Sequence, residues 1–285
     1  MDIAVDGVNI FVKSVGDERN YPLFLLHGGP GLDHTEMWPW FDRLSDQFRL
    51  LYVDQRGQGR SQRVDPATLS LSRFAADVTA LARALGLPRY AVLGHSFGSF
   101  VTLAHAIEQG DASHYVLSGC TASFTKTAPE IEHNLATFEP VALREQVTQS
   151  WALEPHARTQ EDVAKIMDMQ MAFHFATTTS DAYRRYMEVE AEGRAVYSPE
   201  VLAYFATNQY AIEYEDQLRA IRAPTLVITG RHDRTCTPRA SHELHTGIPG
   251  SELVIVPDAG HMTYVEQPDI YFGAMSAFFA LHPTA

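Results

Sequence analysis

The sequence is poor in cysteine and in basic residues, and it has no long hydrophobic run. Its two cysteines, Cys120 and Cys236, are too few for a disulfide framework, so we expect free thiols in a reducing compartment. The 22 lysines and arginines stand against 35 acids, and the net charge of -13 argues against nucleic acid or an anionic membrane as a partner. No apolar run reaches the roughly 18 residues of a transmembrane helix.

Signals for export and for metals are missing as well. The first residues, MDIAVDGVNIFVK, lack a basic region followed by an apolar stretch, so we expect no secretory signal and a cytoplasmic location. The histidine pair His242 and His245 lacks the Glu-x-x-His pattern of zinc hydrolases. We therefore expect neither a metal nor a cofactor, and the sequence leaves the oligomeric state open.

Short apolar runs alternate with helical patterns along most of the chain. Nearly continuous apolar runs are typical of strands that are covered on both faces of a parallel sheet. The runs expected to form strands are residues 9–15, 23–27, 50–54, 90–95, 115–119, 225–230 and 252–257. Amphipathic patterns predict helices over 71–86, 97–110 and 270–282. The sequence thus predicts an α/β fold with a mostly parallel sheet and helices on both faces.

This alternation stops in the middle of the chain. Residues 121–217 show no convincing strand and are rich in Ala, Glu, Met, Gln and Tyr, with helical runs such as EDVAKIMDMQMAFHF. We expect a helical cap there, inserted between the two parts of the core, residues 1–120 and 218–285.

The segment VLGHSFGSF has the pattern Gly-x-Ser-x-Gly around Ser96, with a predicted strand before it and a helix after it. A serine on so tight a turn needs positive φ, and Cβ atoms two residues away would clash, which accounts for Gly94 and Gly98. Its hydroxyl then lies at a helix N-terminus, where negative charge is favoured. We predict that Ser96 is a nucleophile.

A serine nucleophile needs a base, and the base needs an acid that orients it. His261 follows the last predicted strand, and Asp233 follows the strand before it. The order Ser96, Asp233, His261 is that of the triad in α/β-hydrolases. Asp258 is the alternative acid, but it shares the loop of His261 and is poorly placed to aim that ring.

The loop HGGPG, residues 27–31, follows an early strand and exposes its backbone amides. It lacks the Lys-Ser/Thr and Gly-x-Gly-x-x-Gly patterns of phosphate loops. In acyl transfer the oxyanion is held by the N–H after the nucleophile and by an N–H of such a loop. We therefore predict Phe97 and Gly29 as the oxyanion donors, with Gly29 favoured over Gly28.

The motifs HGGPG, DQRGQGRS, GHSFGS and GHM, together with the Asp233 loop, occur in the order of the α/β-hydrolase fold. The pairing of HGGPG with DQRGQGRS resembles the proline iminopeptidase family. The resemblance implies a triad of Ser96, Asp233 and His261 and an oxyanion hole of Gly29 and Phe97.

The chain departs from that family in two places. The family nucleophile turn reads Gly-Gly-Ser-[Trp/Tyr]-Gly, whereas His95 and Phe97 flank the serine here, as is common in esterases. The family also holds the substrate ammonium with acids; here Arg234 follows the triad aspartate, and Gln209 lies near the second position. An arginine facing the pocket would repel an ammonium. Four acids of the predicted cap are candidates for the missing role, with a solvated helix face as the alternative: Glu188, Glu190, Glu213 and Glu215.

These patterns together predict a serine hydrolase that acts on a small molecule or a short peptide. Aminopeptidase activity is what the resemblance implies, a carboxylesterase or lactonase is the alternative, and a non-catalytic ligand-binding protein is a remote third. The residues expected to line the substrate pocket are Gly28, Trp38, Trp40, His95, Gln209 and Arg234.

Overall fold

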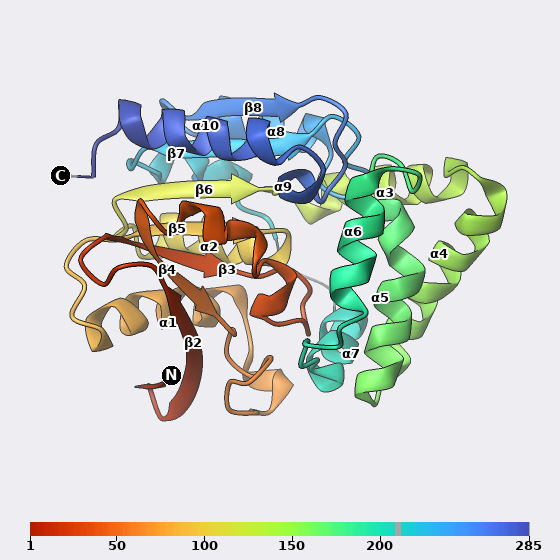
Figure 1. Ribbon diagram of the computed structural model, residues 1–285, viewed down its shortest axis with the longest axis horizontal. Helices are drawn as coiled ribbons and strands as arrows, with labels where there is room; N and C mark the ends of the chain where they lie inside the picture. Colours follow the sequence, from red (N-terminus) through yellow and green to blue (C-terminus); the bar gives the residue numbers. More distant parts are fainter. Residues whose placement is uncertain (209–211, 285) are drawn as a thin grey trace.

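The computed structural model describes residues 1–208 and 212–284, and its centre is an eight-stranded sheet (Figure 1). The strand order across the sheet is β1-β2-β4-β3-β5-β6-β7-β8. The strands are β1 (Asp2–Val5), β2 (Val8–Val15), β3 (Tyr21–Leu26), β4 (Phe48–Val53), β5 (Ala91–His95), β6 (His114–Ser118), β7 (Thr225–Gly230) and β8 (Glu252–Val256). Only the pairings of β2 with β1 and β4 are antiparallel. The expected mostly parallel sheet is confirmed.

Helices pack on both faces of this sheet. Leu23 and Leu25 of β3 face one hydrophobic cluster and Phe24 and Leu26 face the other, and all four are buried. The first cluster is covered by α10 (Pro268–Leu281) and the 3-10 helix η2 (Trp40–Leu44). The second is covered by α1 (Leu71–Ala84), α2 (Phe97–Glu108) and α8 (Pro238–Gly247). Burial on both faces explains why the strands read as continuous apolar runs.

The chain between β6 and β7 is helical. It contains α3 (Phe124–Thr137), α4 (Val141–Leu153), α5 (Gln160–His174), α6 (Asp181–Glu190) and α7 (Pro199–Asn208), with the 3-10 helices η4 (Glu154–His156) and η5 (Glu215–Ala220). These helices gather beside the carboxyl ends of the parallel strands (Figure 1). A single bridge, Ser123 to Glu213, closes the segment at its base. The limits of 121–217 for a cap stay a prediction.

Some short elements have no clear pattern in the sequence. They are the edge strand β1 and the helices η1 (His34–Glu36), η3 (Pro66–Thr68) and α9 (Thr263–Glu266). Cys120 and Cys236 are buried free thiols. Among the residues described, no helix combines the length and the apolar character needed to cross a membrane.

Candidate active site

Ser96 lies at the turn between β5 and α2, with φ 51° and ψ -119°. A residue with a side chain rarely adopts this conformation, so the surrounding structure must impose it. A Cβ on Gly94 would overlap with Gly98 O, and a Cβ on Gly98 would overlap with Leu26 O. Only glycine fits at both positions, and the sequence pattern therefore forms the strand–turn–helix that it predicts.

His261 and Asp233 form a hydrogen-bonded pair, with His261 Nδ1 2.7 Å from Asp233 Oδ2. Asp233 Oδ1 accepts hydrogen bonds of 2.9 Å each from the backbone N–H groups of Thr235 and Cys236. His261 and Ser96 line the same cavity. Asp258, the alternative acid, is exposed and has a φ of 52°. The geometry thus brings the three predicted residues to one place and leaves Asp258 outside it.

The protonation of this pair follows from its burial and its charges. Burial opposes the charge on Asp233, but His261 and the two backbone N–H groups outweigh it and hold the pKa of Asp233 below its usual value. Burial also opposes charge on His261, yet the Asp233 carboxylate raises the pKa of His261 above its usual value. An ionised carboxylate at Nδ1 orients the ring so that Nε2 is the proton acceptor.

The oxyanion loop, residues 27–31, places Gly29 on the lining of the same cavity. The N–H of Gly28 is instead directed at Glu36, whose Oε2 accepts it at 2.5 Å. Phe97 is the first residue of α2, directly after Ser96. The contact to Glu36 favours Gly29 over Gly28 as the donor from this loop.

The motifs HGGPG and DQRGQGRS contact one another. The backbone N–H of Gln55 donates to His27 Nε2 at 3.2 Å, and its side-chain amide donates to His27 O at 2.9 Å. Gln58 Oε1 accepts the N–H of Gly31 at 2.6 Å. Arg56 does not take part, because its guanidinium is paired with Asp77 of α1. The second motif therefore supports the backbone of the first.

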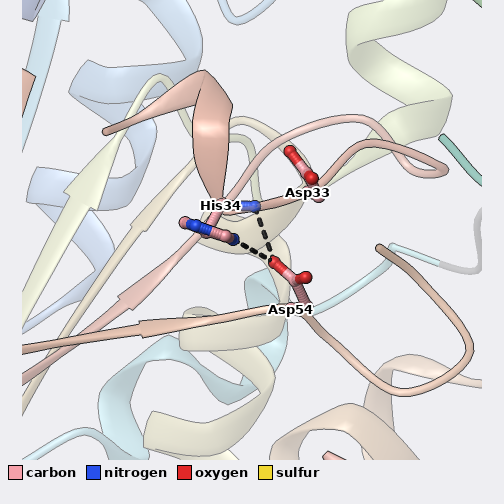
Figure 2. A group of neighbouring side chains, drawn as sticks. All are labelled: Asp33, His34 and Asp54. Atoms are coloured by element: carbon pink, nitrogen blue, oxygen red, sulfur yellow. Dashed lines mark hydrogen bonds and ion pairs between the residues drawn. The ribbon is translucent and has the colours of Figure 1, made fainter. Parts of the chain in front are cut away.

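Asp33 and His34, which follow HGGPG, form a buried group with Asp54, the first residue of DQRGQGRS (Figure 2), and their ligand atoms lie within 4.8 Å of one another. Such a spacing suits a metal ion, but donors already occupy the carboxylates. Asp54 Oδ1 accepts from the backbone N–H of His34 at 2.8 Å and from its Nδ1 at 2.6 Å, as Figure 2 shows. The guanidinium of Arg60 pairs with Asp33 and lies 3.6 Å from Asp54 Oδ2. Arg60 thus supplies the positive charge, and we assign the group a structural role.

A cavity of about 310 Å³ surrounds Ser96 and His261. Its apolar lining includes Phe100, Ile131 and Met171. Four acids also line it: Asp33, Glu36, Glu154 and Glu190. Among the described residues that line it there is no lysine or arginine. The cavity is therefore apolar over much of its surface, with four carboxyl groups in its lining.

Three of these acids have strongly perturbed protonation. Burial raises the pKa of Glu36, Glu154 and Glu190 to about 7 each. Asp33 raises the pKa of Glu190 further, and Arg194 opposes it. His174 also lines the cavity, and burial together with His261 lowers its pKa to about 3. A cationic group in the cavity would stabilise the ionised form of these carboxyls, because its positive charge would offset the cost of burying their negative charge.

Most of the residues predicted to line the substrate pocket lie elsewhere. Gly28 is covered by Glu36, and His95 packs behind His261 with 4.7 Å between ring centroids. Trp40 stacks on the outer side of Tyr186 at 6.2 Å. Trp38 lines a separate hollow beside Lys13 and Arg194. Gln209 lies outside the described residues.

Arg234 also points away from the cavity, which corrects the expectation that it would repel an ammonium. Its guanidinium donates to the backbone oxygens of Phe173 (3.1 Å), Phe175 (2.6 Å) and Ala176 (3.3 Å) at the end of α5. Phe138 lies under the same guanidinium, 4.9 Å from its ring centroid. Unpaired carbonyls at a helix C-terminus attract such a cation. Arg234 therefore ties the helical segment to the Asp233 loop.

Of the four predicted acids, only Glu190 lines the cavity. Glu213 accepts from Ser123 and Thr125, Glu215 pairs with Lys126, and Glu188 is exposed. Glu36 and Glu154 are acids of the cavity that the sequence analysis did not single out. Glu36 follows the oxyanion loop by several residues in a short 3-10 helix, and no recognised motif includes it.

Comparisons with known proteins agree with this architecture. A proline iminopeptidase of Pestalotiopsis fici, PfmaB, is 26% identical over 278 residues, covering 94% of this chain and 95% of the relative. The crystal structure of a proline iminopeptidase from Mycobacterium smegmatis matches with a TM-score of 0.77 at 22% identity, covering 99% of this chain and 98% of that one. An enol-lactonase from Burkholderia xenovorans matches with a TM-score of 0.75 at 23% identity, covering 98% and 100%.

The family assignment is carried by a model of the alpha/beta hydrolase fold, which matches residues 21–268. That range spans all strands from β3 to β8 and the three residues of the candidate triad. The resemblance to proline iminopeptidases noted in the sequence is supported by the curated relatives. The chain belongs to the α/β hydrolase fold family, and it is a hydrolase of that family.

Proposed function

We propose that this hydrolase is a serine hydrolase that releases the N-terminal residue from short peptides, as a proline iminopeptidase does. The observation that carries the proposal is the composition of the cavity around Ser96 and His261, which has four acids and, among its described residues, no lysine or arginine. An N-terminal residue carries its ammonium next to the scissile carbonyl. An acid-lined cavity at the nucleophile suits that charge.

The proposed reaction uses acyl transfer. Ser96 Oγ attacks the carbonyl carbon while His261 Nε2 takes its proton, and the N–H groups of Gly29 and Phe97 hold the oxyanion. His261 then returns the proton to the leaving amine, and the C–N bond breaks. Water repeats the sequence on the acyl-enzyme and frees Ser96. Asp233 keeps its charge throughout and orients His261.

Glu190 is the acid that we assign to the substrate ammonium. It ends α6, lines the cavity and has Arg194 as its neighbouring positive charge. Arg234, which follows the triad aspartate, is held by carbonyls of α5 and does not compete for the ammonium.

A carboxylesterase or lactonase is the second candidate. His95 beside the nucleophile favours it, because the Gly-His-Ser-Phe-Gly form is common in esterases. Neutral esters would enter the same cavity when its carboxyls are protonated.

Turnover of a prolyl arylamide, compared with that of short- and medium-chain aryl esters, tests this proposal, with Ser96→Ala as the control. We expect arylamide turnover at least comparable to ester turnover, and no turnover of either by Ser96→Ala. Ester turnover alone would reject the aminopeptidase in favour of the esterase. Activity that survives in Ser96→Ala would reject the serine mechanism.

A further inference from the structure

Three side chains hold the backbone of the oxyanion loop next to Gly29. Glu36 Oε2 accepts the N–H of Gly28 at 2.5 Å, and Gln55 donates to the oxygen of the same peptide group, His27 O, at 2.9 Å. The next peptide group is held by His27, whose Nδ1–H donates to Gly28 O at 2.8 Å. Gln55 N–H donates to the Nε2 of that ring, which leaves the proton on Nδ1.

These contacts determine where the N–H of Gly29 points. In a trans peptide group the N–H is opposite to the C=O, so a hydrogen bond to Gly28 O also orients the N–H of Gly29. The φ and ψ angles of Gly28 set the orientation of the Gly28–Gly29 peptide group relative to the His27–Gly28 peptide group, which Glu36 and Gln55 hold. Glycine has few intrinsic restraints on these angles, so the loop depends on its side-chain partners.

Glu36 is the partner that lies in the cavity. The residue is 8% exposed, and it lines the cavity together with Ser96, Gly29 and His261. Its carboxylate lies so close to the Cα of Gly28 that a Cβ there would come within 2.5 Å of Oε1. Tyr264, three residues after His261, donates to Glu36 O at 3.1 Å. Glu36 therefore contacts both the oxyanion loop and the segment that carries the base.

We propose that Glu36 is a positioning residue of this active site: its carboxylate holds the N–H of Gly28 and thereby aims the N–H of Gly29 at the oxyanion. The inference rests on the proposed serine mechanism. It also explains a costly feature of the fold, since Glu36 is buried and forms no ion pair with a lysine or arginine among the residues described, which is unfavourable unless its hydrogen bonds matter.

The charge of Glu36 gives this role a measurable signature. Burial raises the pKa of Glu36 to about 7, the N–H of Gly28 and His261 oppose that rise, and the ionised form in turn raises the pKa of His261. Removal of the Glu36 charge therefore lowers the pKa of His261, and the acid limb of kcat/KM moves to lower pH. The titratable groups that face Glu36 are His261, Glu190, Asp33, Tyr186 and Tyr264.

The test compares Glu36→Gln with Glu36→Ala on a neutral aryl ester, which has no amine for the cavity acids to bind. Glutamine keeps an oxygen that can accept from Gly28 N–H, and alanine does not. We expect Glu36→Ala to lower kcat by about 10- to 100-fold with KM nearly unchanged. This loss is smaller than the loss caused by removing an oxyanion donor, because the N–H of Gly29 is misaligned but still present. Glu36→Gln should keep kcat within about threefold and shift the acid limb down by about half to one pH unit. Glu18→Gln, an exposed acid, is the charge-matched control.

Each outcome decides the proposal. A folded Glu36→Ala variant with wild-type kcat overturns it, and so does a Glu36→Gln variant as impaired as Glu36→Ala, because then the acceptor is not what matters. If Glu36→Ala does not fold, Glu36→Leu replaces it, since leucine also lacks an acceptor but fills the space, and a Glu36→Leu variant with the kcat of Glu36→Gln rejects the proposal. A wild-type protein without Ser96-dependent turnover instead rejects the serine mechanism itself, and this inference with it.

Discussion

On the core side of the cavity, Ser96, His261 and Gly29 come from loops whose backbone is hydrogen-bonded. The N–H of Ser96 donates to Ser118 O at 2.9 Å, and the N–H of His261 donates to His174 O at 2.7 Å. In the oxyanion loop, the N–H of Gly28 donates to Glu36 Oε2 at 2.5 Å. On the helical side, Glu154, Glu190 and Tyr197 line the same space from η4, α6 and the chain beyond it. The first side carries the reacting groups together with Asp33 and Glu36, and the second adds two further acids and apolar surface. We therefore expect substitutions on the core side to change the chemistry and substitutions on the helical side to change the choice of substrate.

The largest effect is expected on the core side, from Ser96→Ala. Loss of the nucleophile should lower kcat for any accepted substrate by at least about 10⁴-fold, since the remaining groups act only through it. The melting temperature should not fall, because the Ser96 hydroxyl forms no hydrogen bond within residues 1–208 and 212–284 that alanine would remove. Steady-state kinetics and a labelling assay with a serine-reactive fluorophosphonate measure the effect. Persistent labelling of Ser96→Ala would contradict the assignment.

Arg234→Leu should break the link between the two sides. The change removes a charged donor from three carbonyls at the end of α5, and we expect a loss of about 2 kcal/mol in unfolding free energy. Since the guanidinium does not face the cavity, we expect little effect on substrate choice. The ratio of arylamide to ester turnover in the variant should stay within about threefold of the wild-type ratio.

Denaturant unfolding and substrate ratios, with the exposed Arg231→Leu as the control, measure both quantities. A changed ratio without a change in stability would place Arg234 at the substrate after all.

Glu190→Gln should weaken binding of the substrate ammonium by the helical side and leave the reacting groups of the core side unchanged. Loss of a partly buried charge opposite an ammonium corresponds to roughly 1 kcal/mol or more, so KM for the prolyl arylamide should rise about five- to tenfold. The kinetics of aryl esters should not change. Glu188→Gln on the exposed face of the same helix is the matched control. An equal rise in KM for the arylamide and for the esters would mean that Glu190 affects the shape of the cavity and does not interact with the substrate ammonium.

The smallest effect concerns pH and stability. Burial raises the pKa of Glu36, Glu154, Glu190 and Glu266 in the folded protein to about 7, above the ordinary value near 4.5. The folded state then binds more protons between these two pH values. The contribution to stability is complete below pH 4.5 and is lost as the pH rises through 7.

These four carboxyls should therefore lower the melting temperature as the pH rises from 5.5 to 8. Four histidines with lowered pKa values act in the opposite direction: His27, His95, His114 and His174. The share of one carboxyl is therefore measured by substituting it. The Glu154→Gln variant should show a weaker dependence of melting temperature on pH than the wild type, since an amide does not titrate. Substitution of the exposed Glu139 by Gln should leave this dependence unchanged. Calorimetry at several pH values measures this, and a Glu154→Gln variant whose melting temperature depends on pH just as that of the wild type does would contradict it.

The sequence predicted the core more fully than the cavity, for a physical reason. Gly94, Ser96 and Gly98 belong to a local turn, and five consecutive residues are enough to determine its steric requirements. Strands that are buried on both faces appear in the sequence as apolar runs. The expected strands match the observed ones within two residues at each end; β1 was missed because its four residues are largely exposed at an edge.

The cavity depends instead on which side chains meet from distant segments. Arg234 was expected to face the substrate, but the unpaired carbonyls of α5, about sixty positions earlier in the chain, bind it instead. Trp38 and Trp40 follow the oxyanion loop, yet the chain turns them away from Ser96. Glu36 lies between them and the loop and reaches the cavity. Nothing local in the sequence distinguishes these outcomes, because each is set by the packing of helices against the core.

The most direct test of the central claim is a comparison of a prolyl arylamide with two uncharged counterparts, its N-acetylated form and the cyclopentanecarboxylic arylamide, whose ring has nearly the same shape. The acid-lined cavity predicts that the wild-type protein has at least about tenfold higher kcat/KM for the free amine above pH 7, where the carboxyls are ionised. The preference should shrink as the pH falls below 7. An equal or higher kcat/KM for either uncharged compound would contradict the account.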